Sequence, residues 1–256
     1  PKVSERARAA VPDGERKEKA LAWLRDRVFG GRNIVPLNPR HLKLEPVDGL
    51  TVESYVWWSQ EGIFNHGFAF RGERADGAAL PVSIGLWERG TKRLRDRFEW
   101  IRNVCAQGRI AFVLDVTADG VCTPHPINPR PLHELYGTIQ KLTCDLFWLD
   151  DSLAAIRAFD VIRALDMVKE LPGASAEHAV VYAPDRYSIF AELAAALDGR
   201  ISRLEIGERP ASVADWVRSR HYDPSDSVCT ILPEMLRYFD LPDLRRWRAD
   251  AANSKA

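Results

Sequence analysis

The stretch "VVYAPDRYSIFAELAAAL", Val180–Leu197, places two candidate nucleophiles at the start of a predicted helix. An apolar run typical of a buried strand leads through Pro184 to Asp185, and the helical pattern begins close to Ser188. Carboxylates and serine hydroxyls both form covalent intermediates in enzymes, and a sharp turn from strand to helix exposes such a group. Asp185 and Ser188 are therefore the catalytic candidates.

Both residues also have a purely structural interpretation. Aspartate tolerates the left-handed backbone that a nucleophile needs at such a turn. Its carboxylate can instead cap the helix by accepting the backbone N–H of Ser188, while Pro184 holds the residue before it extended. A serine in the first helical turn bonds locally to the backbone. We predict a cap at Asp185 and a local hydrogen bond at Ser188.

A second group of residues follows two predicted strands. The run "ALPVSIGLWERG" is typical of a buried strand, and a long proline-rich loop over 117–137 follows the strand "RIAFVLDV". Open α/β sheets bind ligands at the carboxyl ends of their parallel strands. The binding candidates that would face such a crevice are Trp87, Glu88, Arg89, His125 and His133. The alternative for the first three is a plain surface loop that caps the sheet.

The histidines of the proline-rich loop also raise the question of a metal site. Asp115 and Asp119 stand near His125 and His133 in the sequence, and imidazole and carboxylate groups are metal ligands. Their spacing specifies no coordination geometry. We therefore predict no metal, and we expect no cofactor.

The order of the predicted elements indicates an α/β fold. Residues 42–71 alternate as antiparallel strands do, and residues 79–116 read as strand, helix and strand, which is a parallel crossover. A long helix from Asp151, two further strands and several helical pieces follow. We expect a flexible segment over 1–12, a single domain over 13–250 and a frayed tail over 251–256.

Composition excludes some classes of function. The 36 acidic residues balance the 36 basic ones, so no overall field attracts nucleic acid. The four cysteines form no Cys-x-x-Cys pair, and we read them as small buried hydrophobes. No segment is apolar enough to span a membrane or to serve as a signal peptide. We expect a soluble chain, secreted or periplasmic if a leader has been removed and cytoplasmic otherwise.

Three further groups of residues are assigned structural roles. Asp240 and Asp243 are expected to cap the helix "LPDLRRW". Asp160, Arg163 and Asp166 read as a solvated row of ion pairs on the long helix. The aromatic residues of the first strands alternate as core residues do, and a stacking platform would require several to be exposed together. These aromatic residues are Trp57, Trp58, Phe64, Phe68 and Phe70.

Four segments together resemble one family of hydrolases. "RPLHELYG", "DDSLAAIRAFDVIRALDMV", "AAALDGRISRLEI" and "LRYFDLPDL" are similar, in sequence and spacing, to the acetyl-xylan-esterase-like branch of the α/β-hydrolase superfamily, over about half of the chain. That resemblance implies a three-layer α/β-hydrolase-like fold and an ancestor that deacetylated plant polysaccharides. It also implies that related proteins carry two such modules in tandem, the second often degenerate.

The resemblance places the serine nucleophile of a Gly-x-Ser-x-Gly-Gly turn at Asp185. Ala183 then stands for the first glycine, and Tyr187 and Ser188 stand for the last two. Every position of the motif differs, and a phenol ring where backbones should touch is expected to reshape the turn. The loop "LWERG" replaces the glycine-rich turn that would supply part of the oxyanion hole.

The resemblance also implies an acid and a histidine on loops that follow "FDLPDL", and the printed chain ends before them. The last histidine, His221, lies in an intervening helical segment, where we expect an exposed or capping role. The last two strands of the sheet are expected to be missing as well. An open edge would then be covered by the C-terminal helices or by another chain, either a second hydrolase module or an identical copy.

Three functions are compatible with the sequence. The first is a degenerate esterase-like module that keeps the scaffold and faces acetylated polysaccharide without turnover. The second is an active carbohydrate deacetylase or carboxylic ester hydrolase that a missing segment or a partner completes. The third is a protein-interaction module that uses the aromatic residues of the N-terminal half.

Overall fold

A computed structural model of the chain describes residues 2–72, 79–219, 223 and 228–253. Its centre is a seven-stranded sheet in the order β1-β2-β3-β5-β4-β6-β7. The strands are β1 (Arg40–Val47), β2 (Leu50–Gln60), β3 (Ile63–Arg71), β4 (Leu80–Gly85), β5 (Ile110–Asp115), β6 (Ala174–Tyr182) and β7 (Ile201–Glu205). The helices are α1 (Lys2–Ala9), α2 (Asp13–Phe29), α3 (Phe98–Ala106), α4 (Thr138–Trp148), α5 (Leu153–Glu170), α6 (Tyr187–Leu197), α7 (Val213–Arg218) and α9 (Leu241–Asn253). Short 3₁₀ turns are η1 (Gly90–Arg93), η2 (Arg95–Arg97), η3 (Gly120–Cys122) and η4 (Met235–Arg237).

The strand directions confirm the predicted α/β class. β1, β2 and β3 pair antiparallel, and β3 joins the rest of the sheet by pairing antiparallel with β5. β4 pairs parallel with both β5 and β6, and β6 pairs parallel with β7. The segment β4, α3 and β5 is the crossover that the sequence predicts, because parallel neighbours need a long connection.

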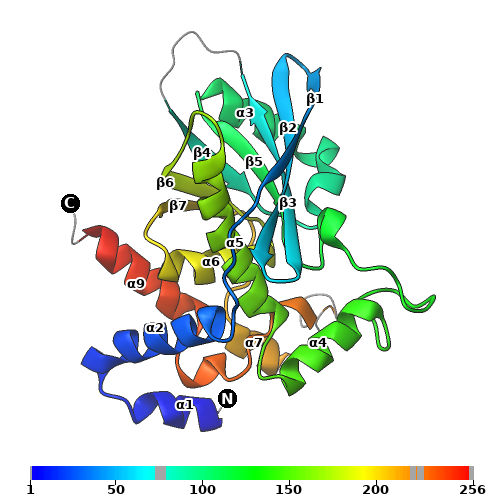
Figure 1. Ribbon diagram of the computed structural model, residues 1–256. Helices are drawn as coiled ribbons and strands as arrows, with labels where there is room; N and C mark the ends of the chain where they lie inside the picture. The colour runs from blue at the N-terminus through cyan, green and yellow to red at the C-terminus, as the bar shows by residue number, and fades with distance from the viewer. Residues whose placement is uncertain (1, 73–78, 220–222, 224–227, 254–256) are drawn as a thin grey trace.

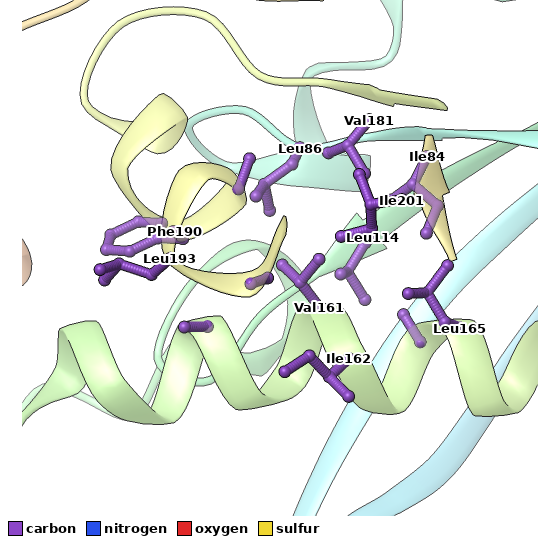
Figure 2. Packing of buried hydrophobic residues seen from close by; sticks show 14 of the residues in the cluster. Ile84, Leu86, Leu114, Val161, Ile162, Leu165, Val181, Phe190, Leu193 and Ile201 are labelled. Carbon is purple, nitrogen blue, oxygen red and sulfur yellow. The ribbon is translucent and has the colours of Figure 1, made fainter. Parts of the chain in front are cut away.

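Helices cover both faces of the sheet, which gives three layers (Figure 1). α2, α5, α6 and α9 contribute to the larger core on one face, whereas α3 packs on the other. Figure 2 shows Val161 and Leu165 on the side of α5 that faces Ile84, Leu114 and Val181 of the central strands. Burial of this apolar face holds the central strands in place. It thereby fixes the positions of the polar residues in the loops that follow β4, β5 and β6.

The prediction of a solvated ion-pair row on α5 is wrong. Asp160 is fully buried and accepts hydrogen bonds from the Ser59 hydroxyl at 2.6 Å and the Thr117 amide at 2.7 Å. Arg163 is 7 % exposed and donates to the carbonyls of Ser59 at 2.9 Å and Val35 at 2.8 Å, besides pairing with Asp166. Partners that are distant in sequence satisfy these groups inside the protein.

Helix α1 contacts residues 218 and 243, which come late in the chain. The segment 1–12, which we expected to be flexible, contains helix α1, whose Arg8 and Glu5 pair with Asp243 and Arg218. Asp243 accepts the backbone N–H of Asp240 at the start of α9, as expected of a capping residue. The carboxylate of Asp240 also accepts the N–H groups of residues 213 and 214, at the start of α7.

The sheet ends at β7, as predicted. Within the described ranges β7 pairs only with β6. Arg248 of α9 donates to the Ile201 carbonyl at 2.9 Å, so the C-terminal helix covers part of that edge. A groove of about 620 Å³ separates the strand from the helix and is lined by Leu204, Arg209 and Leu244, among others. Among the described residues, no helix is both long enough and apolar enough to cross a bilayer.

Candidate functional site

The turn that follows β6 has a left-handed residue at its tip. The Ala183 N–H extends the pairing with β7 by donating to the Glu205 carbonyl at 3.0 Å. Asp185 then has a φ of 53°, and Arg186 returns to the helical region with φ −60° and ψ −22°. The Asp185 N–H donates to the Glu208 carbonyl at 2.7 Å. This backbone turns sharply from strand to helix and leaves Asp185 exposed.

The predicted capping role of the Asp185 carboxylate is wrong. The Ser188 N–H donates to the backbone carbonyl of Asp185 at 3.1 Å, and no side chain caps the first turn of α6. The local hydrogen bond expected of Ser188 is also absent, because its hydroxyl is buried without a hydrogen-bond partner within the described residues. The left-handed residue makes the turn with backbone bonds alone, so no carboxylate cap is needed.

Tyr187 does not abolish this left-handed turn, contrary to our expectation. Its ring lies inside the protein, 3 % exposed, with an edge-on contact of 5.5 Å between its centroid and that of Phe190. Its hydroxyl donates to the carboxylate of Asp119. The pKa of Tyr187 is raised well above its usual value, first by burial and further by the charge of Asp119, while Arg157 opposes the shift.

Asp119 links this turn to the loop after β4. Besides the Tyr187 hydroxyl, its carboxylate accepts the backbone N–H of Arg89 at 3.1 and 3.3 Å. Arg89 itself is left-handed, with a φ of 60°, which directs its amide toward Asp119. The amide that could contribute to an oxyanion hole in this loop is therefore bonded to a carboxylate of the protein.

Arg157 places a buried cation beneath the same turn. Its side chain is 1 % exposed, and its guanidinium donates to the carbonyls of Thr117 at 3.0 Å and Ala118 at 3.2 Å. The guanidinium also lies 5.3 Å from the ring centroid of Phe190. These contacts hold the cation of α5 against the loop that carries Asp119.

His133 is the predicted histidine that reaches this region. It is half-buried, and its pKa is lowered first by burial and then by the charges of Arg157 and Arg186. Asp119 and Glu88 oppose that shift, and Glu88 is paired with Arg186 at 2.8 Å. We call this group the elbow cluster, and its members are Glu88, Asp119, His133, Arg157, Arg186 and Tyr187.

The other predicted binding residues lie outside the elbow cluster. Trp87 is 2 % exposed, and its indole N–H donates to the Gly90 carbonyl at 3.0 Å, so it belongs to the core beneath α3. His125 is exposed in the proline-rich loop. His221 lies outside the described residues. Arg89 contributes its backbone amide to Asp119.

Asp115 was considered as a metal ligand together with Asp119, His125 and His133. In the structure it bonds other groups. It is fully buried and accepts the Thr91 N–H at 2.7 Å, the Val121 N–H at 3.2 Å and a bond from His66 Nδ1 at 2.8 Å. It thus holds the turns η1 and η3 to the end of β5. Across the described ranges, no group of three histidine, cysteine, aspartate or glutamate side chains is arranged to hold a metal ion.

Known proteins resemble this chain in structure but not detectably in sequence. No family sequence model matches the chain, and no curated protein does either. A candidate acetyl xylan esterase from Bacteroides fragilis superposes with a TM-score of 0.66 at 14 % identity over 89 % of this chain and 64 % of its own. Acetyl xylan esterase 1 from Thermoanaerobacterium sp. JW/SL YS485 gives a TM-score of 0.56 at 14 % identity, over 91 % of this chain and 79 % of its own. The acetyl xylan esterase from Paenibacillus sp. R4 gives 0.51 at 17 % identity, over 91 % of this chain and 80 % of its own.

These superpositions define the class of fold. The chain has the α/β-hydrolase fold, in the form found in acetyl xylan esterases. It spans 64 % of the length of the Bacteroides fragilis structure. The expected resemblance to carbohydrate esterases is confirmed at the level of the fold.

Proposed function

We propose that this chain is an acetyl-xylan-esterase-like module that has lost ester hydrolysis at the turn after β6 and keeps the elbow cluster as a binding site for acetylated polysaccharide. One observation carries the proposal. The Asp119 carboxylate bonds both the Arg89 amide and the Tyr187 hydroxyl, beside the turn where acyl transfer would need donors for an oxyanion. A fixed negative charge there repels the oxyanion.

The candidate nucleophiles support the same proposal. Ser188 is buried, and Asp185 is exposed at the tip of the turn. Among the described residues, no hydrogen bond joins a histidine to either side chain, and His133 lies among cations that lower its pKa. Acyl transfer by serine requires a base within hydrogen-bond reach of the nucleophile.

The elbow cluster suits a neutral, hydroxyl-rich ligand. Its accessible members offer one guanidinium group, two carboxylates and an imidazole, which are donors and acceptors that sugar hydroxyls can pair with. Arg157 and Tyr187 are buried, so they support these groups and do not face a ligand. The charges are balanced within the cluster, and Glu88 and Arg186 already form a pair. This balance favours an uncharged sugar over an anionic ligand.

Binding and turnover can be tested on the same protein. We expect acetylated xylo-oligosaccharides to bind with perturbation of the His133 ring resonances in NMR spectra. His133→Ala should weaken binding by about tenfold, the loss of one or two hydrogen bonds. His41→Ala, on exposed β1, serves as the matched control and should change nothing. Equal affinity in the wild type and in His133→Ala would contradict a binding role for the elbow cluster.

The alternative of an active deacetylase makes a different prediction. If a missing segment or a partner completes the site, then joining flanking sequence to this chain should create turnover of aryl acetates and acetylated xylan. That turnover should disappear in Asp185→Ala or Ser188→Ala. Such a result would favour the active enzyme over the degenerate module.

The edge strand β7 supports a proposal about a partner. Its outer edge has no strand neighbour within the described ranges, and Arg248 covers only the Ile201 carbonyl. We expect a second hydrolase module or an identical chain to pair there. The aromatic-platform alternative is weaker, because Trp57 and Phe70 are buried in the core and Phe64, 47 % exposed, already stacks on Trp58.

A further inference from the structure

Three side chains on β2, β3 and β5 form a hydrogen-bonded chain of serine, histidine and aspartate. The Ser54 Oγ lies 2.9 Å from His66 Nε2, and His66 Nδ1 lies 2.8 Å from Asp115 Oδ2. No sequence pattern relates these residues, because they lie 12 and 49 positions apart on strands that only the folded sheet brings together. We call them the strand triad.

The bonding of Asp115 fixes the tautomer of His66. An ionised carboxylate only accepts hydrogen bonds, so Nδ1 carries the proton that points at Asp115. The other nitrogen, Nε2, is then the acceptor, and the Ser54 hydroxyl donates to it. Asp115 is itself held by the Thr91 and Val121 amides, so the imidazole cannot turn away without breaking that network.

Burial is graded along the strand triad. Asp115 is fully buried, His66 is 7 % exposed and Ser54 is half-buried. The hydroxyl is therefore the member of the triad that an external molecule can reach. A buried carboxylate, an oriented imidazole and a reachable hydroxyl are the roles that a nucleophilic serine, its base and its orienting group require.

A mostly apolar groove is lined by two neighbours of Ser54, Val52 and Phe68. It has a volume of about 390 Å³, and its lining also includes Leu44, Val47, Phe70, Leu94 and Phe98 together with the charged Glu45, Asp48 and Arg95. Val52 lies two residues before Ser54 on the same face of β2, and Phe68 is the direct partner of Ser54 on β3. Ser54 thus lies beside two residues of a groove whose apolar lining can accept hydrocarbon.

We propose that Ser54 is a reactive nucleophile that accepts acyl groups from esters of apolar carboxylic acids. The Ser54 oxygen attacks the ester carbonyl carbon while His66 Nε2 takes the hydroxyl proton. The bond to the alkoxy group then breaks, the alcohol leaves with that proton, and the acyl chain stays on Ser54 as an ester within the groove. Asp115 is a positioning residue that keeps the imidazole in this tautomer. The inference is independent of the elbow cluster, which takes no part in it.

The test is covalent labelling of the full chain with an alkyl fluorophosphonate, read by peptide mass spectrometry. We expect the label on Ser54 and none on Ser54→Ala. His66→Gln, which keeps a polar side chain but removes the base, should slow labelling at Ser54 by at least about a hundredfold, as is usual for loss of a general base. Ser175→Ala is the matched control, since Ser175 is a half-buried serine on β6 that bonds a backbone amide and not a histidine.

The acyl preference tests the groove separately. The chain should take the acyl group from p-nitrophenyl hexanoate about tenfold faster than from p-nitrophenyl acetate, because the longer chain gains apolar contact. Phe98→Ala, at a groove position away from His66, should reduce that ratio. Labelling of other serines in place of Ser54, or an unchanged labelling rate in folded His66→Gln, would overturn the proposal. Asp185→Ala should leave Ser54 labelling intact, because the strand triad does not use the turn after β6.

Discussion

The turn after β6 has the backbone conformation of a nucleophile turn, but the polar side chains around it bond to one another. Asp185 keeps the left-handed conformation, while the neighbouring Tyr187 is buried and bonded to Asp119. Asp119 in turn accepts the Arg89 amide. The turn is held by polar contacts in places where an esterase would need donors for its substrate.

The Tyr187 hydroxyl should contribute measurably to stability. Tyr187→Phe keeps the buried ring and removes a hydrogen bond to a carboxylate, so we expect a loss of about 1.5–3 kcal/mol in the free energy of unfolding. Tyr182→Phe is the control, because its hydroxyl only accepts a 3.3 Å bond from Arg97. Urea denaturation measures both. Equal losses in the two variants would argue against the Tyr187–Asp119 bond.

Two glycines beside Asp115 test the close packing of η1 and η3. Gly90 and Gly120 have positive φ, and an added Cβ would lie 1.9 and 2.0 Å from Asp115 Oδ1. Gly108 also has positive φ but has open space around it. Alanine at Gly108 should cost about 1–2 kcal/mol for the left-handed backbone, and alanine at Gly90 or Gly120 about 2–5 kcal/mol because the clash is added. Similar costs at all three positions, measured by thermal unfolding, would contradict the close approach.

Sequence reasoning at the residue scale found part of the candidate site. Glu88 and Arg89 follow the carboxyl end of β4, where the strand order predicts ligand sites, and His133 lies in the loop between β5 and α4. Their binding of a ligand stays a prediction. The partner of Tyr187 lies 68 residues away, and the hydroxyl that bonds Asp160 lies 101 residues away. No local pattern encodes pairs at such separations. The sequence therefore predicted that Asp160 and Arg163 are solvated, whereas both form hydrogen bonds inside the protein.

At the scale of elements, one ion pair ties α9 to α6. Arg245 donates to both oxygens of Glu192, at 2.9 and 3.0 Å, and the Glu192 side chain is 3 % exposed. Arg245 also donates to the carbonyls of Ala211 and Pro210. This contact positions the C-terminal helix beside the open edge of β7.

Removal of the arginine should make stability depend on pH. Burial raises the Glu192 pKa above its usual 4.5, and Arg245 opposes that shift. In Arg245→Met the pKa rises further, so the folded variant holds a proton that the unfolded chain has released. Its stability therefore falls as pH rises above about 4.5, and at neutral pH the loss should reach about 3–5 kcal/mol.

The double variant Glu192→Leu with Arg245→Met is the control for this prediction. It removes the buried carboxylate, so the additional pH dependence should disappear and part of the stability should return. Urea unfolding at a series of pH values measures both effects. A loss in Arg245→Met that stays constant from about pH 4 to about pH 7 would show that Glu192 is not the group responsible.

The elements themselves were largely predictable. Alternating residues over 42–71 gave the antiparallel strands, and continuous apolar runs gave the buried parallel ones. The helix α1 was missed because it carries no buried residue and is tied to the fold by ion pairs with Arg218 and Asp243. Helices of that kind leave no apolar periodicity to detect.

The whole molecule has the fold found in acetyl xylan esterases. It superposes on acetyl xylan esterases over about nine-tenths of its length, yet identity is 14–17 %. The fold and the site can diverge separately in evolution. The core fixes the positions of the strand ends, whereas the loops after the strands supply the side chains of the site. The strand triad lies on β2, β3 and the end of β5, and it shares no residue with the elbow cluster.

The most direct test of the central claim is the steady-state rate of p-nitrophenyl acetate hydrolysis by the intact chain and by Asp185→Ala and Ser188→Ala. We predict that both variants match the wild type, as the proposed loss of acyl transfer at this turn requires. Saturable turnover in the wild type that either substitution removes, with the fold retained, would contradict the account.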